Sequence, residues 1–145
     1  MNKRWINFSG LLLVCLTLTA SVAAQNHLGS GKKLKAGQEL KNRKGILFMR
    51  HVGNLTMYDT DHNVEWETGT YIEWGQQIQY AHMSEAGDLE VIVKDDDTGK
   101  LIALWSSKTS EKYGAKAAGA HLEIDWNKYL LRIVSKHGKE LWRSQ

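Results

Sequence analysis

Three tryptophans recur at nearly equal spacing along the chain, and each is followed two positions later by Thr or Ser. The copies are Trp66-Glu67-Thr68, Trp105-Ser106-Ser107 and Trp142-Arg143-Ser144, at intervals of 39 and 37 residues. A segment of turn-forming residues precedes each tryptophan, and an alternating apolar segment precedes each turn. The turns are 59–63, 95–100 and 135–139, and the alternating segments are 48–58, 83–93 and 124–134. A fixed period of this length is typical of proteins built from structural repeats.

Each repeat is predicted to be a strand, a turn and a second strand that carries the tryptophan. The alternating segments hold a leucine at the corresponding place: Leu55, Leu89 and Leu130. One unit of this size cannot bury its own apolar face, but three units around an axis can share one interior. We therefore expect the tryptophans and leucines to form a common core, with the opposite face of each sheet in water.

The rest of the chain also favours β-structure. It contains no proline and 13 glycines, and its alternating segments are short. Clusters of Asp, Asn, Gly and Thr between them are typical of tight turns. The best helix-forming segment, residues 115–120, is short and interrupted by glycine, so it is predicted to be a loop or the start of a strand. The predicted fold class is all-β.

The first 24 residues have the plan of a secretory signal peptide. Lys3 and Arg4 are followed by the apolar segment 10–20 and then by small residues up to Ala24. The apolar segment is too short to span a bilayer, so no transmembrane segment is expected. Cleavage after Ala24 leaves a single domain at residues 25–145, secreted or periplasmic.

The only cysteine, Cys15, lies inside the expected signal peptide. Lipidation at Cys15 is an alternative interpretation, which the bulky Val14 and the continuing apolar run disfavour. The cleaved domain contains no cysteine, which excludes disulfides and a cysteine nucleophile. It carries 17 basic and 16 acidic residues once Lys3 and Arg4 are removed. This near-neutral charge gives no general attraction to nucleic acid, and no nucleic-acid partner is predicted.

One local cluster is basic: Lys32, Lys33, Lys35, Lys41, Arg43 and Lys44. The favoured interpretation is a solvated strand edge, since lysines commonly protect edges from unwanted pairing. Contact with an anionic polysaccharide or lipopolysaccharide is the alternative.

Four segments together resemble the bulb-type lectins, the monocot mannose-binding family that also has bacterial members. They are 28–31 (LGSG), 34–40 (LKAGQEL), 48–59 (FMRHVGNLTMYD) and 64–68 (VEWET). The resemblance covers nearly all of residues 25–145 and is weaker in the second and third repeats. It implies a β-prism of three antiparallel sheets related by a pseudo-threefold axis. It also implies a protein that binds carbohydrate.

The sugar site of that family is Gln-x-Asp-x-Asn-x-Val-x-Tyr, expected along one strand so that alternate side chains share a face. In this chain the motif is eroded in every repeat. The first repeat has Arg50, Val52, Asn54, Thr56 and Tyr58, and the second has Ser84, Ala86, Asp88, Glu90 and Ile92. Aligned on Leu130, the third has Asp125, Asn127, Tyr129, Leu131 and Ile133. A slip of one residue in this third alignment is left open, and it would turn the opposite side chains outward.

The predicted function is glycan binding through polar side chains on these faces, with a cell-surface polysaccharide as the expected partner. The candidate site residues are Arg50, Asn54, Tyr58, Ser84, Asp88, Asp125, Asn127 and Tyr129. Arg50 in place of Gln favours an acidic sugar, because guanidinium pairs with carboxylate. The alternative is a lectin scaffold reused as a protein-binding module, such as a secreted inhibitor or an envelope assembly factor.

No catalytic constellation was found, and the chain is predicted to be a non-enzyme without metal or cofactor. No Gly-x-Ser-x-Gly motif occurs. The carboxylates at 59–63 and 95–99 lack the complete pattern of a calcium loop and lie where hairpins must turn. His51 and His62 are the one histidine pair expected to approach each other, within the first hairpin.

The chain ends in an apolar strand that carries the third tryptophan. Trp142 lies only three residues from the C-terminus, and a terminal strand left at an edge is prone to fray. Bulb-type lectins commonly exchange this strand between subunits. We therefore predict a homodimer through the C-terminal strand, with a self-closed monomer as the alternative.

Overall fold

The computed structural model describes residues 26–128 and 130–145. The expected signal peptide and the candidate residue Tyr129 lie outside the described residues. The strands are β1 (His27–Leu28), β2 (Lys33–Lys35), β3 (Glu39–Lys41), β4 (Gly45–Met49), β5 (Leu55–Asp59), β6 (Val64–Glu67), β7 (Gln76–Met83), β8 (Leu89–Asp95), β9 (Leu101–Ser106), β10 (His121–Ile124), β11 (Leu131–Val134) and β12 (Glu140–Arg143).

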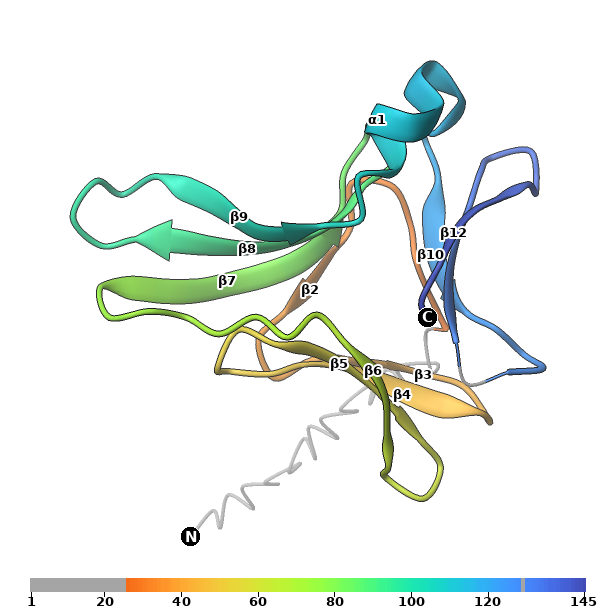
Figure 1. Ribbon diagram of the computed structural model, residues 1–145, viewed down its shortest axis with the longest axis horizontal. Coiled ribbons are helices and arrows are strands. Elements are labelled where there is room, and N and C mark those ends of the chain that lie inside the picture. Colours follow the sequence, from red (N-terminus) through yellow and green to blue (C-terminus); the bar gives the residue numbers. More distant parts are fainter. Residues whose placement is uncertain (1–25, 129) are drawn as a thin grey trace, which may run out of the picture.

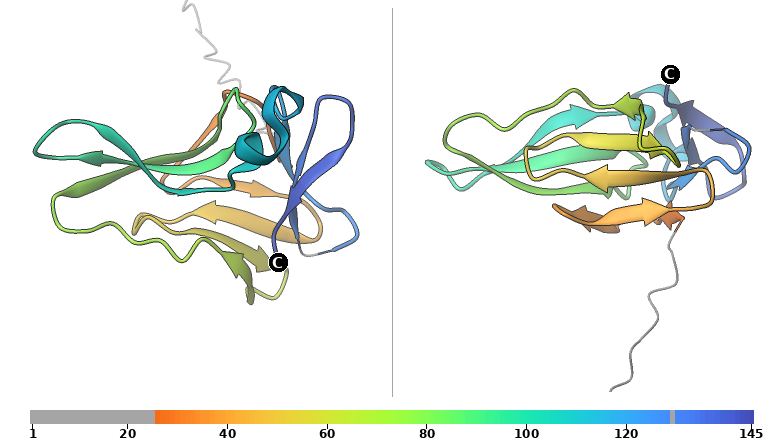
Figure 2. Two further views of the ribbon diagram at one scale, coloured as in Figure 1. Left: turned by 45° about the horizontal axis from the view of Figure 1, so that its top comes forward. Right: turned by 90° about the horizontal axis from the view of Figure 1, so that it is seen from below.

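The strands form three antiparallel sheets of four strands each, arranged around a shared centre (Figure 1). Their orders are β3-β4-β5-β6, β2-β7-β8-β9 and β1-β10-β11-β12. Figure 2 shows the same three sheets from two further sides. The first strand of every sheet comes from the segment before β4, so the N-terminal part of the domain contributes to all three. The predicted all-β prism with three repeats is confirmed.

The repeats are equivalent in backbone register as well as in order. Met57 pairs with Trp66, Val91 with Trp105 and Ile133 with Trp142, and the register shifts directly after each pair. The hydroxyl two residues after each tryptophan accepts the backbone N–H of a core leucine. These bonds are Leu55 N to Thr68 Oγ1 at 3.1 Å, Leu89 N to Ser107 Oγ at 3.0 Å and Leu131 N to Ser144 Oγ at 2.9 Å. The repeated Trp-x-Thr/Ser therefore ties each outer strand to its neighbour.

The three tryptophans gather in the centre, as the repeats predicted. Trp66 and Trp105 lie 5.6 Å apart between ring centroids, Trp66 and Trp142 5.7 Å, and Trp105 and Trp142 6.0 Å. All three contacts are edge to face, a geometry in which the positive ring edge meets the negative ring face. The rings are partly buried and pack against the fully buried side chains of the core. Core packing of these tryptophans is confirmed.

Each predicted alternating strand is a hairpin rather than one continuous strand. In the first repeat the chain turns at residues 50–54, where Arg50 N donates to Asn54 O at 2.9 Å. The second repeat turns at 84–88, with Ser84 N to Asp88 O at 2.8 Å. Glycines at φ +95° and +100°, Gly53 and Gly87, permit these turns. The alternation breaks at both turns, where two polar residues follow one another: Arg50–His51 and Ser84–Glu85.

The sequence alignment of the third repeat was one residue off. Its turn runs from Asp125 to Leu130, whose O accepts Asp125 N at 2.9 Å, and is one residue longer than the others. Leu131, rather than Leu130, is therefore the counterpart of Leu55 and Leu89, and it is fully buried. Leu131 and Ile133, placed by the alignment at motif positions, belong to the core.

A short helical segment, which the sequence did not predict, follows β9. The loop expected at residues 115–120 is confirmed in part, because only residues 115 and 116 are helical and residues 117–119 form a turn before β10. α1 spans Thr109–Tyr113, and the 3-10 helix η1 spans Gly114–Lys116. After η1 the chain turns back to β10, and Ala117 lies fully buried against the second hairpin turn. Tyr113 packs against the core cluster, and α1 lies between the second and third sheets, in contact with β12 (Figure 1).

β12 pairs with β11 of its own chain. The single chain thus completes its third sheet without a partner. The homodimer by strand exchange stays a prediction, because exchange would form the same β11–β12 contacts between two chains.

Candidate functional site

One row of four paired residues crosses the outward face of each sheet. The rows are Glu39–Phe48–Thr56–Glu67, Lys33–His82–Glu90–Ser106 and His27–Glu123–Arg132–Arg143. Side chains that alternate with the core residues along a strand share the opposite face. We call these surfaces the first, second and third outer faces. Most sequence-predicted site residues lie on or beside them, and the three faces differ in chemistry.

Asn54 of the first face is fully buried and makes three internal hydrogen bonds. Its Oδ1 accepts Thr68 Oγ1 at 2.9 Å and Gly69 N at 3.1 Å, and its Nδ2 donates to Glu67 Oε2 at 2.6 Å. Thr68 Oγ1 lies 2.8 Å from Thr70 Oγ1. This network joins the turn before β5 to the segment after β6. Asn54 therefore holds the backbone in place and leaves only one N–H for a ligand.

Arg50 and Tyr58 are the polar residues of the first face that remain uncommitted. Both are half-buried, and neither side chain makes a hydrogen bond or ion pair with the residues that the structure describes. In register with Tyr58 lie two apolar residues, Ile46 and the exposed Val64. Val52, at the position of the family's Asp, is 41% exposed in the turn. The first face thus combines free polar groups with apolar surface.

Thr56 lies between Arg50 and Tyr58 along this face and has an unusual hydroxyl. The side chain is fully buried, and its Oγ1 has no hydrogen-bond partner among the described residues. Thr56 stands where the family motif has Val. An unpaired buried hydroxyl is unfavourable by about 1–3 kcal/mol.

The predicted residues of the second face, Ser84 and Asp88, are used internally. Ser84 Oγ accepts Asp88 N at 3.0 Å, and the buried Asp88 carboxylate accepts both the backbone N–H (2.8 Å) and the hydroxyl of Ser110. These bonds fix the turn before β8 to the start of α1. The Asp88 carboxylate is committed to Ser110, whereas the half-buried Ser84 hydroxyl only accepts a bond among the described residues and keeps its O–H.

A cluster that sequence reasoning missed occupies the second face instead. His82 Nε2 lies 2.8 Å from Glu90 Oε2, and the ring of Tyr80 meets that of His82 at 5.4 Å. Lys33 Nζ lies 4.1 Å from the centroid of the Tyr80 ring. The alternation of β7 was the available signal, because Tyr80 and His82 share the face of Glu90. Both precede Ser84, the first motif position of the second repeat, and so lie outside the motif.

The third face is neutralised by its own ion pairs. Arg132 binds Glu123 through Nε and Nη2, each at 2.5 Å, and Arg143 binds Glu140 through both nitrogens at 2.9 and 2.6 Å. The hydrogen bonds from Arg143 hold the pKa of Glu140 below its usual value and raise that of Arg143. The buried Asp125 accepts Asn127 N at 2.8 Å within its turn, and Asn127 is exposed. Few groups on this face are free for a ligand.

The metal and catalytic alternatives gain no support. His51 precedes β5 and His62 follows it, so the pair lies at opposite ends of the strand and does not meet as expected. Asp59 Oδ1 instead accepts Asp61 N and Asn63 N, both at 2.8 Å, as in an ordinary turn. The hydrogen bonds from Asn63 are the main cause that lowers the pKa of Asp59. Within residues 26–128 and 130–145 no group of three His, Cys, Asp or Glu side chains is placed to hold a metal ion.

Comparison with solved structures identifies the architecture. A monomeric mannose-binding lectin from Gastrodia elata superposes with a TM-score of 0.65 at 21% identity, over 83% of this chain and 96% of that one. The snowdrop (Galanthus nivalis) mannose-specific agglutinin, solved with methyl-α-D-mannoside, gives 0.58 at 24% identity over 81% and 94%. A lectin from Allium sativum gives 0.57 at 24% identity over 81% and 98%.

The chain has the β-prism fold of the monocot mannose-binding lectins. These neighbours are lectins, and at 21–24% identity the likeness establishes the fold. No protein-family model matches the chain, and no curated protein sequence matches it. Among the described residues, no helix has the length and apolar character needed to cross a membrane.

Proposed function

We propose that the protein is an exported carbohydrate-binding lectin whose principal site is the first outer face. The observation that carries this proposal is the pair of uncommitted polar groups, Arg50 and Tyr58, beside exposed apolar surface at Val64. Sugar rings offer hydroxyls along their edges and C–H groups on their faces. A protein surface with a few oriented polar groups beside apolar side chains can bind both the hydroxyls and the C–H groups of a sugar.

The same face does not reproduce the mannose motif. Arg50 and Val52 replace its Gln and Asp, and Asn54 is occupied by Glu67, Thr68 and Gly69. The unpaired guanidinium of Arg50 favours a sugar that carries a carboxylate, because that pair forms two parallel charge-assisted hydrogen bonds. We therefore assign an acidic sugar rather than mannose to the first face.

Export is part of the proposal and rests on residues 1–24. Their basic start, apolar segment and small residues up to Ala24 have the order of a secretory signal. The proposed location, periplasmic or extracellular, would place the face in contact with envelope or cell-surface glycans.

A glycan array on the processed chain, residues 25–145, tests the proposal. The array should include neutral mannosides, uronic acids and sialylated glycans. We expect binding to acidic glycans and weaker or no binding to mannosides. If the protein binds no glycan at all, the proposed lectin function is wrong. If it binds mannosides alone, the pairing of Arg50 with an acidic sugar is wrong.

A second function, protein binding, is favoured by one feature of the second sheet. β9 is its outer strand and exposes Leu101 (58%), Ile102 (41%) and Ala103. An exposed apolar edge strand is a template for an added strand from another chain. A pull-down from envelope extract that yields one stoichiometric protein, independent of glycans, would favour this function over the first.

A further inference from the structure

Two adjoining cavities lie beside α1 and η1, and the first extends to Glu140 and Arg143 at the margin of the third outer face. The first has a volume of about 560 Å³ and includes Trp66, Lys108, Lys112 and Trp142 in its lining. The second has about 350 Å³, and its basic lining residues are Lys116, Lys136, His137 and Lys139. Tyr113 and Leu141 line both cavities and so form the wall that they share.

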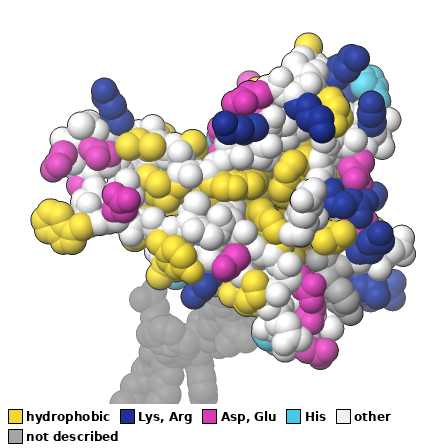
Figure 3. Space-filling view, in the orientation of Figure 1, with side chains coloured by type: hydrophobic (Ala, Val, Ile, Leu, Met, Phe, Trp, Pro, Cys, Tyr) yellow, Lys and Arg dark blue, Asp and Glu magenta, His cyan; other side chains and the backbone are white. Residues whose placement is uncertain are grey.

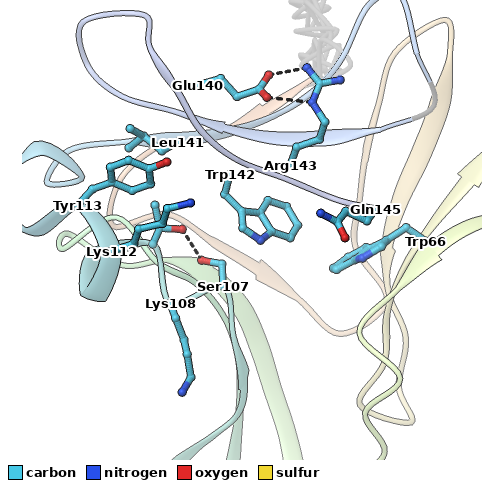
Figure 4. Close-up of a pocket in the computed structure, with 11 residues that line it drawn as sticks. Trp66, Ser107, Lys108, Lys112, Tyr113, Glu140, Leu141, Trp142, Arg143 and Gln145 are labelled. Carbon is cyan, nitrogen blue, oxygen red and sulfur yellow. Dashed lines mark hydrogen bonds and ion pairs between the residues drawn. The ribbon is translucent and has the colours of Figure 1, made fainter.

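The first cavity has aromatic walls. Figure 4 shows the indoles of Trp142 and Trp66 on either side of the Gln145 side chain, with the Tyr113 ring beside Leu141. The Lys112 ammonium lies 5.2 Å from the Tyr113 ring centroid and is directed toward Trp142. Aromatic rings next to a few polar groups are typical of sites for small organic ligands. Here the rings suit the C–H faces of sugar residues.

The charge around both cavities is strongly positive. Lys112, Lys116, Lys136 and Lys139 form no ion pair with the described residues, and Lys108 approaches Glu111 only at 3.9 Å on an exposed surface. The nearby Glu140 is already neutralised by Arg143. Figure 3 shows dark blue side chains gathered over α1 and the β11–β12 turn. Because the processed chain has a net charge near zero, this concentration is local.

Lys108 occupies a backbone conformation that lysine rarely adopts. Its φ is +54°, and the equivalent position after Trp66 is Gly69 at φ +65°. A side chain in the left-handed region destabilises the fold, by about 1 kcal/mol. The first repeat avoids this destabilisation with glycine, whereas the second repeat has Lys108, which lines the first cavity while its side chain is directed away from Trp142 and Tyr113 (Figure 4). Such local strain is often found at functional sites.

We propose that these two cavities form a second ligand site, which binds an anionic oligosaccharide. One sugar residue lies against Trp142 and Tyr113 in the first cavity, where Lys112 pairs with its sulfate or carboxylate. The chain then crosses the Tyr113–Leu141 wall, and a second anionic group reaches Lys136 and Lys139. The site is independent of the function proposed for the first outer face.

The test uses isothermal titration of the processed chain, residues 25–145, with a dextran sulfate oligosaccharide, a neutral dextran of equal length and an inorganic polyphosphate of equal charge. We expect only dextran sulfate to bind tightly. The double variant Lys112→Gln/Lys139→Gln should weaken it by about tenfold, and the matched control Lys94→Gln/Lys100→Gln on the β8–β9 turn by less than twofold.

Lys108→Gly separates ligand binding from folding. It introduces the glycine of the first repeat, so the melting temperature should rise, while affinity for dextran sulfate should change far less than in the Lys112/Lys139 double variant because the Lys108 side chain points away from Trp142 and Tyr113. Equal binding of polyphosphate would overturn the saccharide assignment, because polyphosphate has no C–H face to pack on the rings. Unchanged affinity in the Lys112/Lys139 double variant would overturn the site itself.

Discussion

The hydroxyl of Thr68 donates to Oδ1 of Asn54 at 2.9 Å, across 14 residues of sequence. The bond links the turn before β5 to the segment after β6. Asn54 also donates to the Glu67 carboxylate and accepts the backbone N–H of Gly69. A motif residue that the resemblance assigns to sugar binding is thus a structural residue in this chain. The first prediction follows from this relationship.

Asn54→Ala is expected to lower the free energy of unfolding by about 2–4 kcal/mol, because it leaves a buried hydroxyl and a backbone N–H without their acceptor. Chemical denaturation of the variant measures this loss. Asn63→Ala in the exposed β5–β6 turn is the control and should cost less than half as much. Equal losses in the two variants would mean that the buried hydrogen bonds of Asn54 stabilise the fold no more than those of an exposed turn.

Thr56→Val is expected to stabilise the fold by about 1 kcal/mol. Val has nearly the shape of Thr and removes the buried hydroxyl that has no partner among the described residues. Thermal melting reports the gain as a rise of a few degrees. Thr60→Val, at an exposed position, should leave the melting temperature unchanged. A lower melting temperature for Thr56→Val would show that the hydroxyl is satisfied in solution.

Gly87→Ala is expected to cost more than 2 kcal/mol for two reasons. Gly87 has φ +100°, and an added Cβ would clash with the carbonyl of Ala117 at 2.1 Å. Gly138 has φ +83° with nothing within 4 Å, so Gly138→Ala isolates the backbone strain at about 1 kcal/mol. Comparable losses in urea unfolding of the two variants would contradict the close approach of Ala117 to this turn.

The Asp59 carboxylate predicts a loss of stability in acid. The hydrogen bonds from Asn63 lower its pKa below the ordinary 3.8. The folded state therefore binds a proton less readily than the unfolded state, so the stabilisation is complete above about pH 5 and fades as the pH falls through the folded-state pKa. The melting-temperature gap between the parent protein and Asp59→Asn should be constant from pH 5 to 7 and shrink toward pH 3. A melting-temperature gap that widens in acid would mean that folding raises the pKa of Asp59 instead of lowering it.

The oligomeric state is open to direct measurement. Light scattering at micromolar concentration is expected to give twice the mass of the processed chain. Deleting residues 140–145 should abolish both the dimer and folding, because it removes Trp142 from the central triad and Ser144 from its bond to Leu131. A monomeric mass for the processed chain would establish the self-closed arrangement, in which β12 pairs only within its own chain.

The central packing was predictable because its signals are local and repeated. Trp66, Trp105 and Trp142 recur with the same hydroxyl two residues later, and that hydroxyl makes the same bond in each repeat. The turns within the alternating segments were missed, because the family motif is expected along a single strand and the breaks in alternation at Arg50–His51 and Ser84–Glu85 are short. The decisive signals were the two glycines at positive φ, Gly53 and Gly87.

The candidate site was less predictable, because tertiary contacts decide which polar atoms stay free. Asn54 and Asp88 bond to residues 13 to 22 positions away, and no periodicity reveals such partners. The alignment of the third repeat was wrong for another reason. Its turn has one extra residue, so the side chains expected to face outward face the core, and those expected in the core face outward. Arg50 and Tyr58 alone of the three first-repeat candidates keep polar atoms available.

Titration of the best glycan from the array against the parent protein, Arg50→Ala and Tyr58→Phe tests the central claim most directly. Each variant should weaken binding by about fivefold or more, with the melting temperature unchanged. Tyr80→Phe, at a tyrosine of the second outer face beside Lys33, should bind as the parent does. Full affinity in both Arg50→Ala and Tyr58→Phe would contradict a sugar site on the first outer face.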